Sequence, residues 1–172
     1  GTHSKWVDLR GSRIVAFRTA MTGELFALLR HQSILAAGVG APLVEDGPAF
    51  VDGVTDARES ASAGGLSRLF GIRAAMLSGV LASDAVPARL SGLLIGEEIR
   101  MMVATGTFDV SRPLWLVGDA ALCSRYRVAL EVFGMASVLA ADAAAHGLWM
   151  IAARAGLLGA PDAPEPAPRG AA

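Results

Sequence analysis

The sequence predicts an α/β domain that opens on a β-hairpin, continues through a helical middle and ends in a β-α-β-α unit. Apolar residues alternate on both sides of Gly11-Ser12, which is typical of two strands joined by a tight turn. Apolar residues then recur at helical spacing through the middle of the chain. From residue 113 onward, short apolar runs alternate with helical patterns, which indicates a parallel sheet flanked by helices, with its ligand at the strand ends.

Composition and charge favour a globular protein with a core of its own. The 172 residues are 53% hydrophobic and carry a formal net charge of −1, so the chain has neither the basic footprint of a nucleic-acid-binding protein nor the charge excess of a disordered one. Charged and polar residues interrupt the most apolar region, 134–158, and we expect neither secretion nor a membrane span. The single cysteine, Cys123, fits a reducing cytoplasm.

The first five residues predict a phosphate-binding loop ahead of the hairpin. They offer backbone N–H groups, two hydroxyls and one ammonium to an anion. The residues are Gly1, Thr2, His3, Ser4 and Lys5. Their spacing matches neither a Walker loop nor a dinucleotide fingerprint, so an ordinary polar turn is the alternative.

The first helix is expected over residues 21–37, with Thr22 as its N-cap and Gly38 as its stop. Glu24 in its first turn complements the helix dipole, which is a purely structural role. The same Thr22-Gly23-Glu24 turn, beside a phosphate loop, could instead hydrogen-bond a polyol or a sugar acid.

Three further helices are expected over residues 48–61, 66–77 and 83–106, after a loop over 39–47. The longest contains Gly92 and Gly96 in its interior. Each glycine costs about 1 kcal/mol relative to alanine there, so we expect close packing at both positions. Glu97 and Glu98 follow these glycines. A role for either of them as a catalytic acid is the weaker interpretation.

The last third is expected to form a buried strand over 113–117, a helix over 120–133, a second strand over 136–140 and a helix over 143–155. Gly118-Asp119 stands at the carboxyl end of the first of these strands. Asp119 is either a catalytic carboxylate or the cap of the following helix. Residues 159–172 hold four prolines, which predicts a disordered tail outside the 1–158 domain.

Four stretches carry a family resemblance: GTHSKWV at 1–7, FRTAMTGELF at 17–26, FGIRA at 70–74 and SGLLIG at 91–96. They resemble the 2-dehydro-3-deoxygalactonokinase family, sugar-acid kinases of the actin/hexokinase/Hsp70-type ATPase superfamily. The resemblance covers almost all of this chain but only the later part of the family. It implies a ribonuclease H-like, actin-like ATPase domain, and a truncated or split protein whose N-terminal portion is missing or supplied by a partner chain.

The resemblance implies Mg-ATP-dependent phosphorylation of 2-dehydro-3-deoxy-D-galactonate at its C6 hydroxyl, a cytoplasmic step of D-galactonate catabolism. Gly118 and Tyr126 match positions near the nucleotide, while Thr22, Gly23, Glu24 and Arg73 would bind the sugar acid. No protein metal ligands are assigned. The catalytic base stays open among Asp8, Glu24, Asp119 and a residue of the missing portion.

Two alternatives remain: one is a protein of a different functional class, and the other is a kinase with a different substrate. The chain could be a non-catalytic binding or assembly module, because it lacks the first phosphate loop of the superfamily. It could also be a kinase for another sugar or sugar acid. A homodimer is possible in either case, because a parallel sheet without its opening strand exposes an edge.

Overall fold

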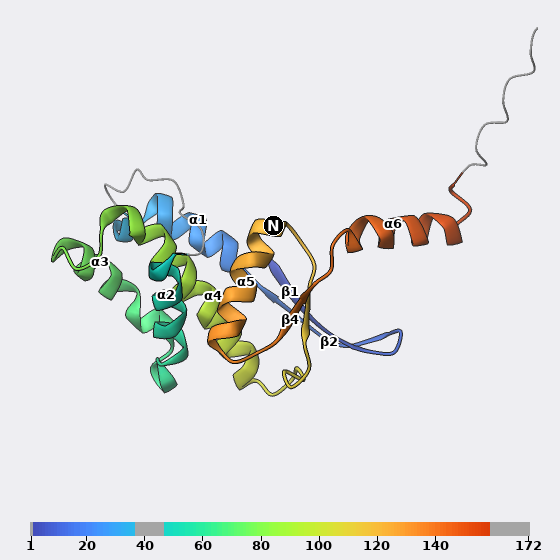
Figure 1. Ribbon diagram of the computed structural model, residues 1–172, viewed down its shortest axis with the longest axis horizontal. Coiled ribbons are helices and arrows are strands. Elements are labelled where there is room, and N and C mark those ends of the chain that lie inside the picture. The colour runs from blue at the N-terminus through green and yellow to red at the C-terminus, as the bar shows by residue number, and fades with distance from the viewer. Residues whose placement is uncertain (1, 37–46, 159–172) are drawn as a thin grey trace, which may run out of the picture. The chain divides into compact units, whose positions relative to one another are not determined.

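A computed structural model describes residues 2–36 and 47–158, coloured along the chain in Figure 1. Contacts divide the chain into two units, Gly1–Leu139 and Ala140–Ala172, and each is described by itself. The predictions made for Gly1, for a helix stop at Gly38 and for the tail at 159–172 lie outside the described residues. The structure is of the α/β class and follows the predicted order of elements.

The opening hairpin is confirmed. Strands β1 (Ser4–Arg10) and β2 (Arg13–Ala20) pair antiparallel with Val7 opposite Phe17. Gly11 takes a φ of +62°, which a glycine adopts without strain at a tight turn.

The prediction of a polar loop running to Lys5 is wrong at its end, because β1 already begins at Ser4. The strand alternates as a half-buried strand does: Ser4, Trp6 and Asp8 are half-buried, whereas the residues between them are exposed. Polar side chains occupy the inner face because a buried hydrogen-bond acceptor, described below, lies beneath it.

The helical middle contains α1 (Thr22–Gln32), α2 (Pro48–Arg58), α3 (Leu69–Leu77) and α4 (Val86–Ala104). These helices are shorter than predicted, because 3-10 turns take up several of their ends. The turns span Ile34–Ala36, Ala61–Ala63, Gly65–Arg68 and Ser83–Ala85. Thr22 is the first helical residue and not the N-cap, which is Met21, and the Thr22 hydroxyl points to an acceptor on α4.

Helix α4 is the centre of the first unit and contacts α1, α2, α3 and α5 (Figure 1). Every residue from Val86 to Ile99 except Arg89 is buried. The predicted close packing at the helix glycines is confirmed. A Cβ atom on Gly92 would lie 2.0 Å from the Phe50 carbonyl oxygen of α2, and one on Gly96 would lie 2.8 Å from the Ala57 Cβ.

The β-α-β part is confirmed: β3 (Leu114–Leu116) and β4 (Ser137–Leu139) are parallel and joined by α5 (Ala120–Val132). The expectation that β3 is buried is wrong, since Trp115 is 70% exposed. Leu114 and Leu116 pack against the core shared with α5, whereas Trp115 between them points away from it.

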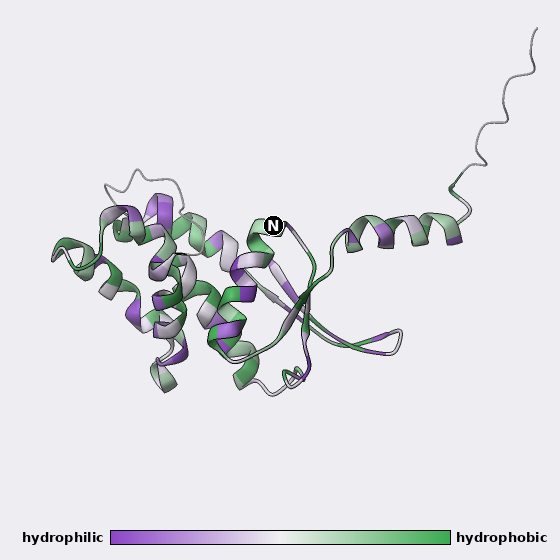
Figure 2. Ribbon diagram, in the orientation of Figure 1, coloured by the Kyte–Doolittle hydropathy of each residue, from purple (hydrophilic) through white to green (hydrophobic). Residues whose placement is uncertain are grey.

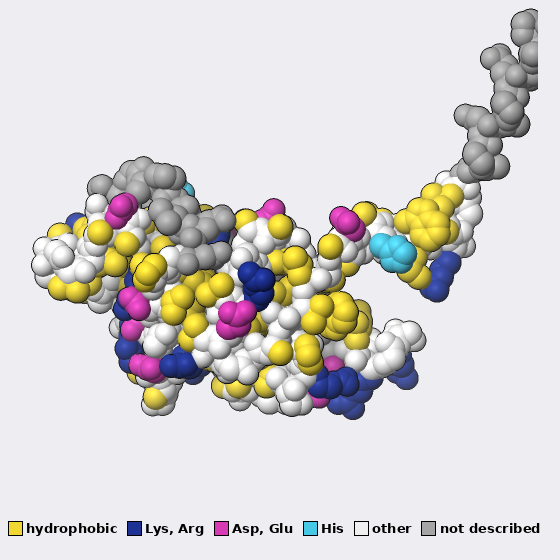
Figure 3. Space-filling view, in the orientation of Figure 1, with side chains coloured by type: hydrophobic (Ala, Val, Ile, Leu, Met, Phe, Trp, Pro, Cys, Tyr) yellow, Lys and Arg dark blue, Asp and Glu magenta, His cyan; other side chains and the backbone are white. Residues whose placement is uncertain are grey.

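In the second unit, α6 (Ala143–Arg154) agrees with the predicted helix. Hydrophobic residues predominate along it (Figure 2), and Leu148, Trp149 and Ile151 are exposed. The space-filling view also shows hydrophobic side chains over the visible face of the first unit (Figure 3). Among the described residues, no helix is both long and apolar enough to cross a membrane.

Candidate active site

A cleft of about 1380 Å³ opens in the first unit. Its walls come from β1, α1, α4, β3 and α5, segments that are far apart in the sequence. The cleft therefore brings together side chains from most of the predicted site. The predicted site residues that line it are His3, Ser4, Lys5, Asp8, Thr22, Gly23, Gly118, Asp119 and Tyr126.

Three predicted residues are not among those lining the cleft: Thr2, Glu24 and Arg73. Glu24 lies next to the lining, because its Oε2 is 2.6 Å from His3 Nε2 and its backbone N–H donates to the Thr2 carbonyl at 3.1 Å. Arg73 lies on α3, half-buried.

The acceptor beneath the hairpin is Glu98 of α4, whose side chain is almost fully buried. Its Oε1 accepts from Ser4 Oγ at 2.6 Å and from Trp6 Nε1 at 2.7 Å. Its Oε2 accepts from the Thr22 hydroxyl and from Tyr126 Oη at 2.8 Å. Four donors from β1, α1 and α5 thus converge on one carboxylate.

This arrangement explains how a carboxylate can lie in the core. An isolated buried charge is very unfavourable, whereas each hydrogen bond to a charged group contributes about 1.5–3 kcal/mol. Two donors on each oxygen occupy the acceptor positions that a carboxylate offers. Glu98 therefore fixes the strand, helix and side chains around it, and its own oxygens are not available to take a proton from a substrate.

Burial raises the pKa of Tyr126, and the neighbouring Glu98 carboxylate raises it further. The hydroxyls of Ser4 and Thr22 oppose this effect. The phenol therefore stays protonated and donates a hydrogen bond to Glu98.

The neighbouring Glu97 has a different role. It accepts from the Gly65 backbone N–H at 2.7 Å and from Arg100 through two nitrogens, each at 2.7 Å. The hydrogen bonds from Arg100 hold the pKa of Glu97 below its usual value. Glu97 is not among the residues that line the cleft, and it ties α4 to the 3-10 turn at Gly65–Arg68.

The three candidate bases differ in how their carboxylates are held. Asp119 caps α5, since its Oδ1 accepts from the backbone N–H groups of Ala121 and Leu122 at 3.1 Å each. Glu24 is bound to His3. Asp8 lines the cleft, and its Oδ2 lies 3.8 Å from Arg10 Nε.

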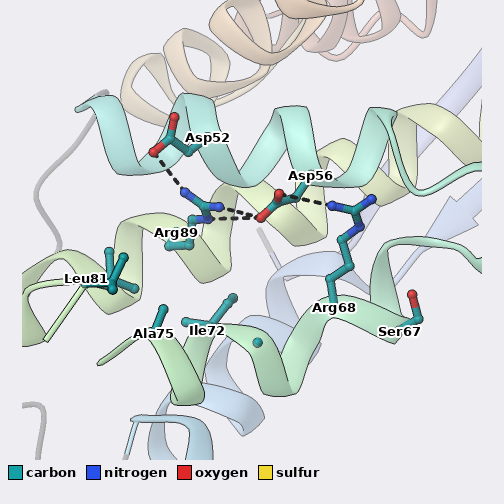
Figure 4. A pocket seen from close by; sticks show the side chains of 10 residues that line it. Asp52, Asp56, Ser67, Arg68, Ile72, Ala75, Leu81 and Arg89 are labelled. Carbon is teal, nitrogen blue, oxygen red and sulfur yellow. Dashed lines mark hydrogen bonds and ion pairs between the residues drawn. The ribbon is translucent and has the colours of Figure 1, made fainter. Parts of the chain in front are cut away.

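A second cavity, of about 490 Å³, lies between α2, α3 and α4 (Figure 4). Arg89 binds Asp56 through Nη2 at 2.6 Å and Asp52 through Nη1 at 2.8 Å. Arg68 reaches the other Asp56 oxygen at 3.4 Å. Because the charged groups of this cavity neutralise each other, we assign no ligand to it.

A protein-family model matches most of this chain. The family model described as DGOK, 2-keto-3-deoxy-galactonokinase, matches residues 1–151. The chain belongs to this family.

Two curated relatives agree. A Rhizobium meliloti (strain 1021) protein named "Probable 2-dehydro-3-deoxygalactonokinase DgoK1" is 42% identical over 83% of this chain and 46% of its own length. The 2-dehydro-3-deoxygalactonokinase of Escherichia coli (strain K12) is 36% identical over 78% of this chain and 44% of its own length. The chain spans about half the length of the curated relatives it matches.

A solved structure has the same fold over most of this chain. It is a crystal structure of a Sinorhizobium meliloti protein assigned by its description to the 2-dehydro-3-deoxygalactonokinases. The TM-score is 0.80 and the sequences are 38% identical, over 92% of this chain and 53% of the other.

Sequence reasoning missed Glu98 as the organising residue of the site. One signal was present: an acidic pair, Glu97-Glu98, inside an apolar helix most of whose other positions are core residues. Buried carboxylates are rare unless they are paired or hydrogen-bonded, so this pair pointed to partners elsewhere in the fold. The sequence did not show which of the two would face the cleft.

Proposed function

We propose that this chain forms part of a Mg-ATP-dependent kinase that phosphorylates 2-dehydro-3-deoxy-D-galactonate at its C6 hydroxyl. The product would be 2-dehydro-3-deoxy-6-phosphogalactonate, within cytoplasmic D-galactonate catabolism. One observation carries the proposal: a single cleft gathers the residue 3–8 segment, the Thr22-Gly23 turn and the end of β3 in a chain of this kinase family. The proposal includes a ribonuclease H-like fold for the whole protein.

The segment at residues 1–5 would bind the phosphates of ATP. Phosphoryl transfer needs positioning and charge stabilisation more than covalent chemistry. Lys5 is exposed, and its Nζ donates to the His3 carbonyl at 3.3 Å, so the ammonium can turn toward an arriving anion. The Ser4 hydroxyl is committed to Glu98, which leaves the Lys5 ammonium, the Thr2 hydroxyl and backbone N–H groups as the donors of this segment.

The nucleotide would lie where β3 ends and α5 begins. Gly118 lines the cleft there without a side chain, and Tyr126 lies farther along α5. Ligands of parallel sheets bind outside the carboxyl ends of the strands, which is where this turn lies.

The sugar acid would bind at the Thr22-Gly23 turn, beside Glu24. Arg73 stays a proposed ligand for the substrate carboxylate, although it is not among the residues that line the cleft. An Arg73→Gln variant that binds the sugar acid as tightly as the unchanged chain would remove it from the site.

Asp8 is the proposed base among the three candidates, because Glu24 and Asp119 are held by His3 and by the α5 backbone. Among the described residues, no group of three or more His, Cys, Asp or Glu side chains is placed to hold a metal ion. Mg²⁺ in kinase sites is bound through substrate phosphates and one or two carboxylates, and Asp8 and Asp119 in the cleft fit that requirement. When bound, the ion would neutralise charge on the transferred phosphoryl group.

A coupled ADP-release assay tests the proposal. The chain is given Mg-ATP and 2-dehydro-3-deoxygalactonate, alone and after mixing with an N-terminal fragment of a full-length relative. Turnover in the mixture supports the kinase, and a panel of other sugar acids defines its substrate. A folded chain that is inactive in both settings would leave the second candidate, a binding or assembly module.

A further inference from the structure

We propose that Glu98 sets the hydrogen-bond polarity of the cleft, so that Ser4, Thr22 and Tyr126 present only acceptor oxygens to a ligand. This inference names the ligand chemistry at one part of the cleft, and it rests on the proposed function only for the identity of the sugar acid. The part concerned, called here the hydroxyl subsite, is formed by the side-chain oxygens of these three residues, all of which line the cleft.

A serine, threonine or tyrosine hydroxyl has one proton to donate and lone pairs that accept. In this structure all three protons are used by Glu98, at 2.6 Å from Ser4 and 2.8 Å from Tyr126, with Thr22 on the same carboxylate. What remains on each oxygen is acceptor capacity.

The three hydroxyls cannot easily give up their hydrogen bonds to Glu98. Trp6 Nε1 also donates to it, at 2.7 Å, so two donors bind each carboxylate oxygen. The carboxylate is buried on α4, away from water that could replace a lost donor. Turning one hydroxyl toward a ligand would leave a buried charge short of a hydrogen bond, which is unfavourable.

The hydroxyl subsite therefore selects groups that donate. A hydroxyl of a polyol donates to such oxygens, whereas a fully ionised phosphate oxygen only accepts and finds no donor there. Hydroxyl groups of a bound polyol, such as those of a sugar acid, and not phosphate oxygens, therefore belong at these three side-chain oxygens.

Replacing Glu98 by glutamine makes a specific test. The amide has the same shape as the carboxylate, but one of the two acceptor oxygens becomes a donor NH2 group. Trp6 Nε1 can only donate, so the amide oxygen must face Trp6 and Ser4. The amide nitrogen then faces Thr22 and Tyr126 and donates to them. Their hydroxyl protons become free to turn into the cleft.

The first measurement needs no ligand. Hydroxyl protons of the chain are observed by NMR with the Glu98 carboxyl carbon labelled. We expect slowly exchanging protons from Thr22 and Tyr126 that couple to this carbon, and their loss in Glu98→Gln. Hydroxyl protons that exchange freely with water in the unchanged chain would overturn the inference.

The second measurement is binding by calorimetry, with the sugar acid, simple polyols and their deoxy and fluoro analogues. Fluorine accepts but does not donate, so at one hydroxyl position we expect the fluoro analogue to bind about tenfold more weakly. In Glu98→Gln that difference should shrink or reverse. The matched control is Glu97→Gln, on the adjacent residue that is held by Arg100, and it should leave the difference unchanged.

The outcomes separate the two proposals. Sugar-acid turnover combined with equal binding of every fluoro analogue would overturn the hydroxyl subsite and keep the kinase. Binding of another polyol with the donor requirement intact would keep the subsite and reject the substrate. If Glu98→Gln does not fold, Tyr126→Phe removes one acceptor and should weaken the hydroxyl ligand without affecting its fluoro analogue. Absence of binding by the whole panel would overturn the subsite.

Discussion

At the residue scale, two adjacent glutamates show how surroundings determine role. Glu98 is held by neutral donors and faces the cleft, whereas Glu97 is held by Arg100 and the Gly65 N–H. Because the folded pKa of Glu97 is lowered from 4.5, its ionised form stabilises the fold above that value, and the stabilisation is lost as the pH falls through the lowered pKa.

We expect Glu97→Gln to lower the free energy of unfolding by about 1–3 kcal/mol at pH 7, because it removes the charge that Arg100 binds. The difference from the unchanged chain should narrow as the pH falls below 4.5, because the unfolded chain takes up the proton first and the folded chain follows at lower pH. Urea unfolding at several pH values measures this. Glu59→Gln, in an exposed pair with Arg58, is the control and should change stability by less than about 0.5 kcal/mol. A pH-independent difference for Glu97→Gln would contradict the assignment.

Asp119 can be tested in a way that separates capping from catalysis. Asp119→Asn keeps an oxygen for the N–H groups of Ala121 and Leu122, so stability should hardly change, whereas Asp119→Ala should lose about 1 kcal/mol. If Asp119 only caps α5, ADP release by Asp119→Asn in the mixed assay should match the unchanged chain. Loss of turnover with full stability would make Asp119 a catalytic carboxylate and displace Asp8 from that role.

At the element scale, the pairing of α2 with α4 holds in place the helix that carries Glu98. The two backbones touch through Gly53 and Gly92: a Cβ atom on Gly53 would lie 2.2 Å from the Arg89 carbonyl oxygen, and one on Gly92 would lie 2.0 Å from that of Phe50. Close approach of this kind admits no side chain, and Glu98 lies on the same helix less than two turns away.

Gly92→Ala should therefore destabilise the fold by about 3 kcal/mol or more, since the helices must separate to admit the methyl group. Gly71→Ala, on α3, meets nothing within 4 Å and should be neutral or stabilising by up to about 1 kcal/mol. Thermal unfolding followed by circular dichroism gives both values. Similar melting temperatures for the two variants would refute the packing argument.

At the scale of the whole molecule, the hairpin exposes apolar surface. Val7 and Phe17 face each other across the ladder, 42% and 52% exposed. Contiguous exposed apolar surface marks an interaction site, and sheet edges are ready to pair.

We expect the isolated chain to associate with itself at raised concentration, and Phe17→Lys to suppress this, because a lysine in an exposed strand opposes pairing. Sedimentation velocity measures the mass against the 17.7 kDa of one chain. Val80→Lys, at an exposed turn after α3, is the control and should leave association unchanged. A single 17.7 kDa species at every concentration would show that the hairpin surface does not pair two copies.

The sequence by itself determined the elements and the family. Alternation around Gly11-Ser12 gave the hairpin, and the apolar run at 113–117 gave a strand followed by the helix that Asp119 caps. These signals are short-range, since a strand or a helix is specified by residues two to four positions apart. The motif strings at 1–7 and 17–26 pointed to the family in the same way, and the family model confirms it.

Only the tertiary structure decided which side chains meet. Glu98 lies 94 residues from Ser4, 76 from Thr22 and 28 from Tyr126, and no local pattern encodes those contacts. It also showed that the Asp119 carboxylate caps α5 and that Arg73 is not among the residues that line the cleft. The physical reason is that a buried carboxylate is stable only where several donors converge on it, and that convergence is a property of packed helices and strands, not of any one of them.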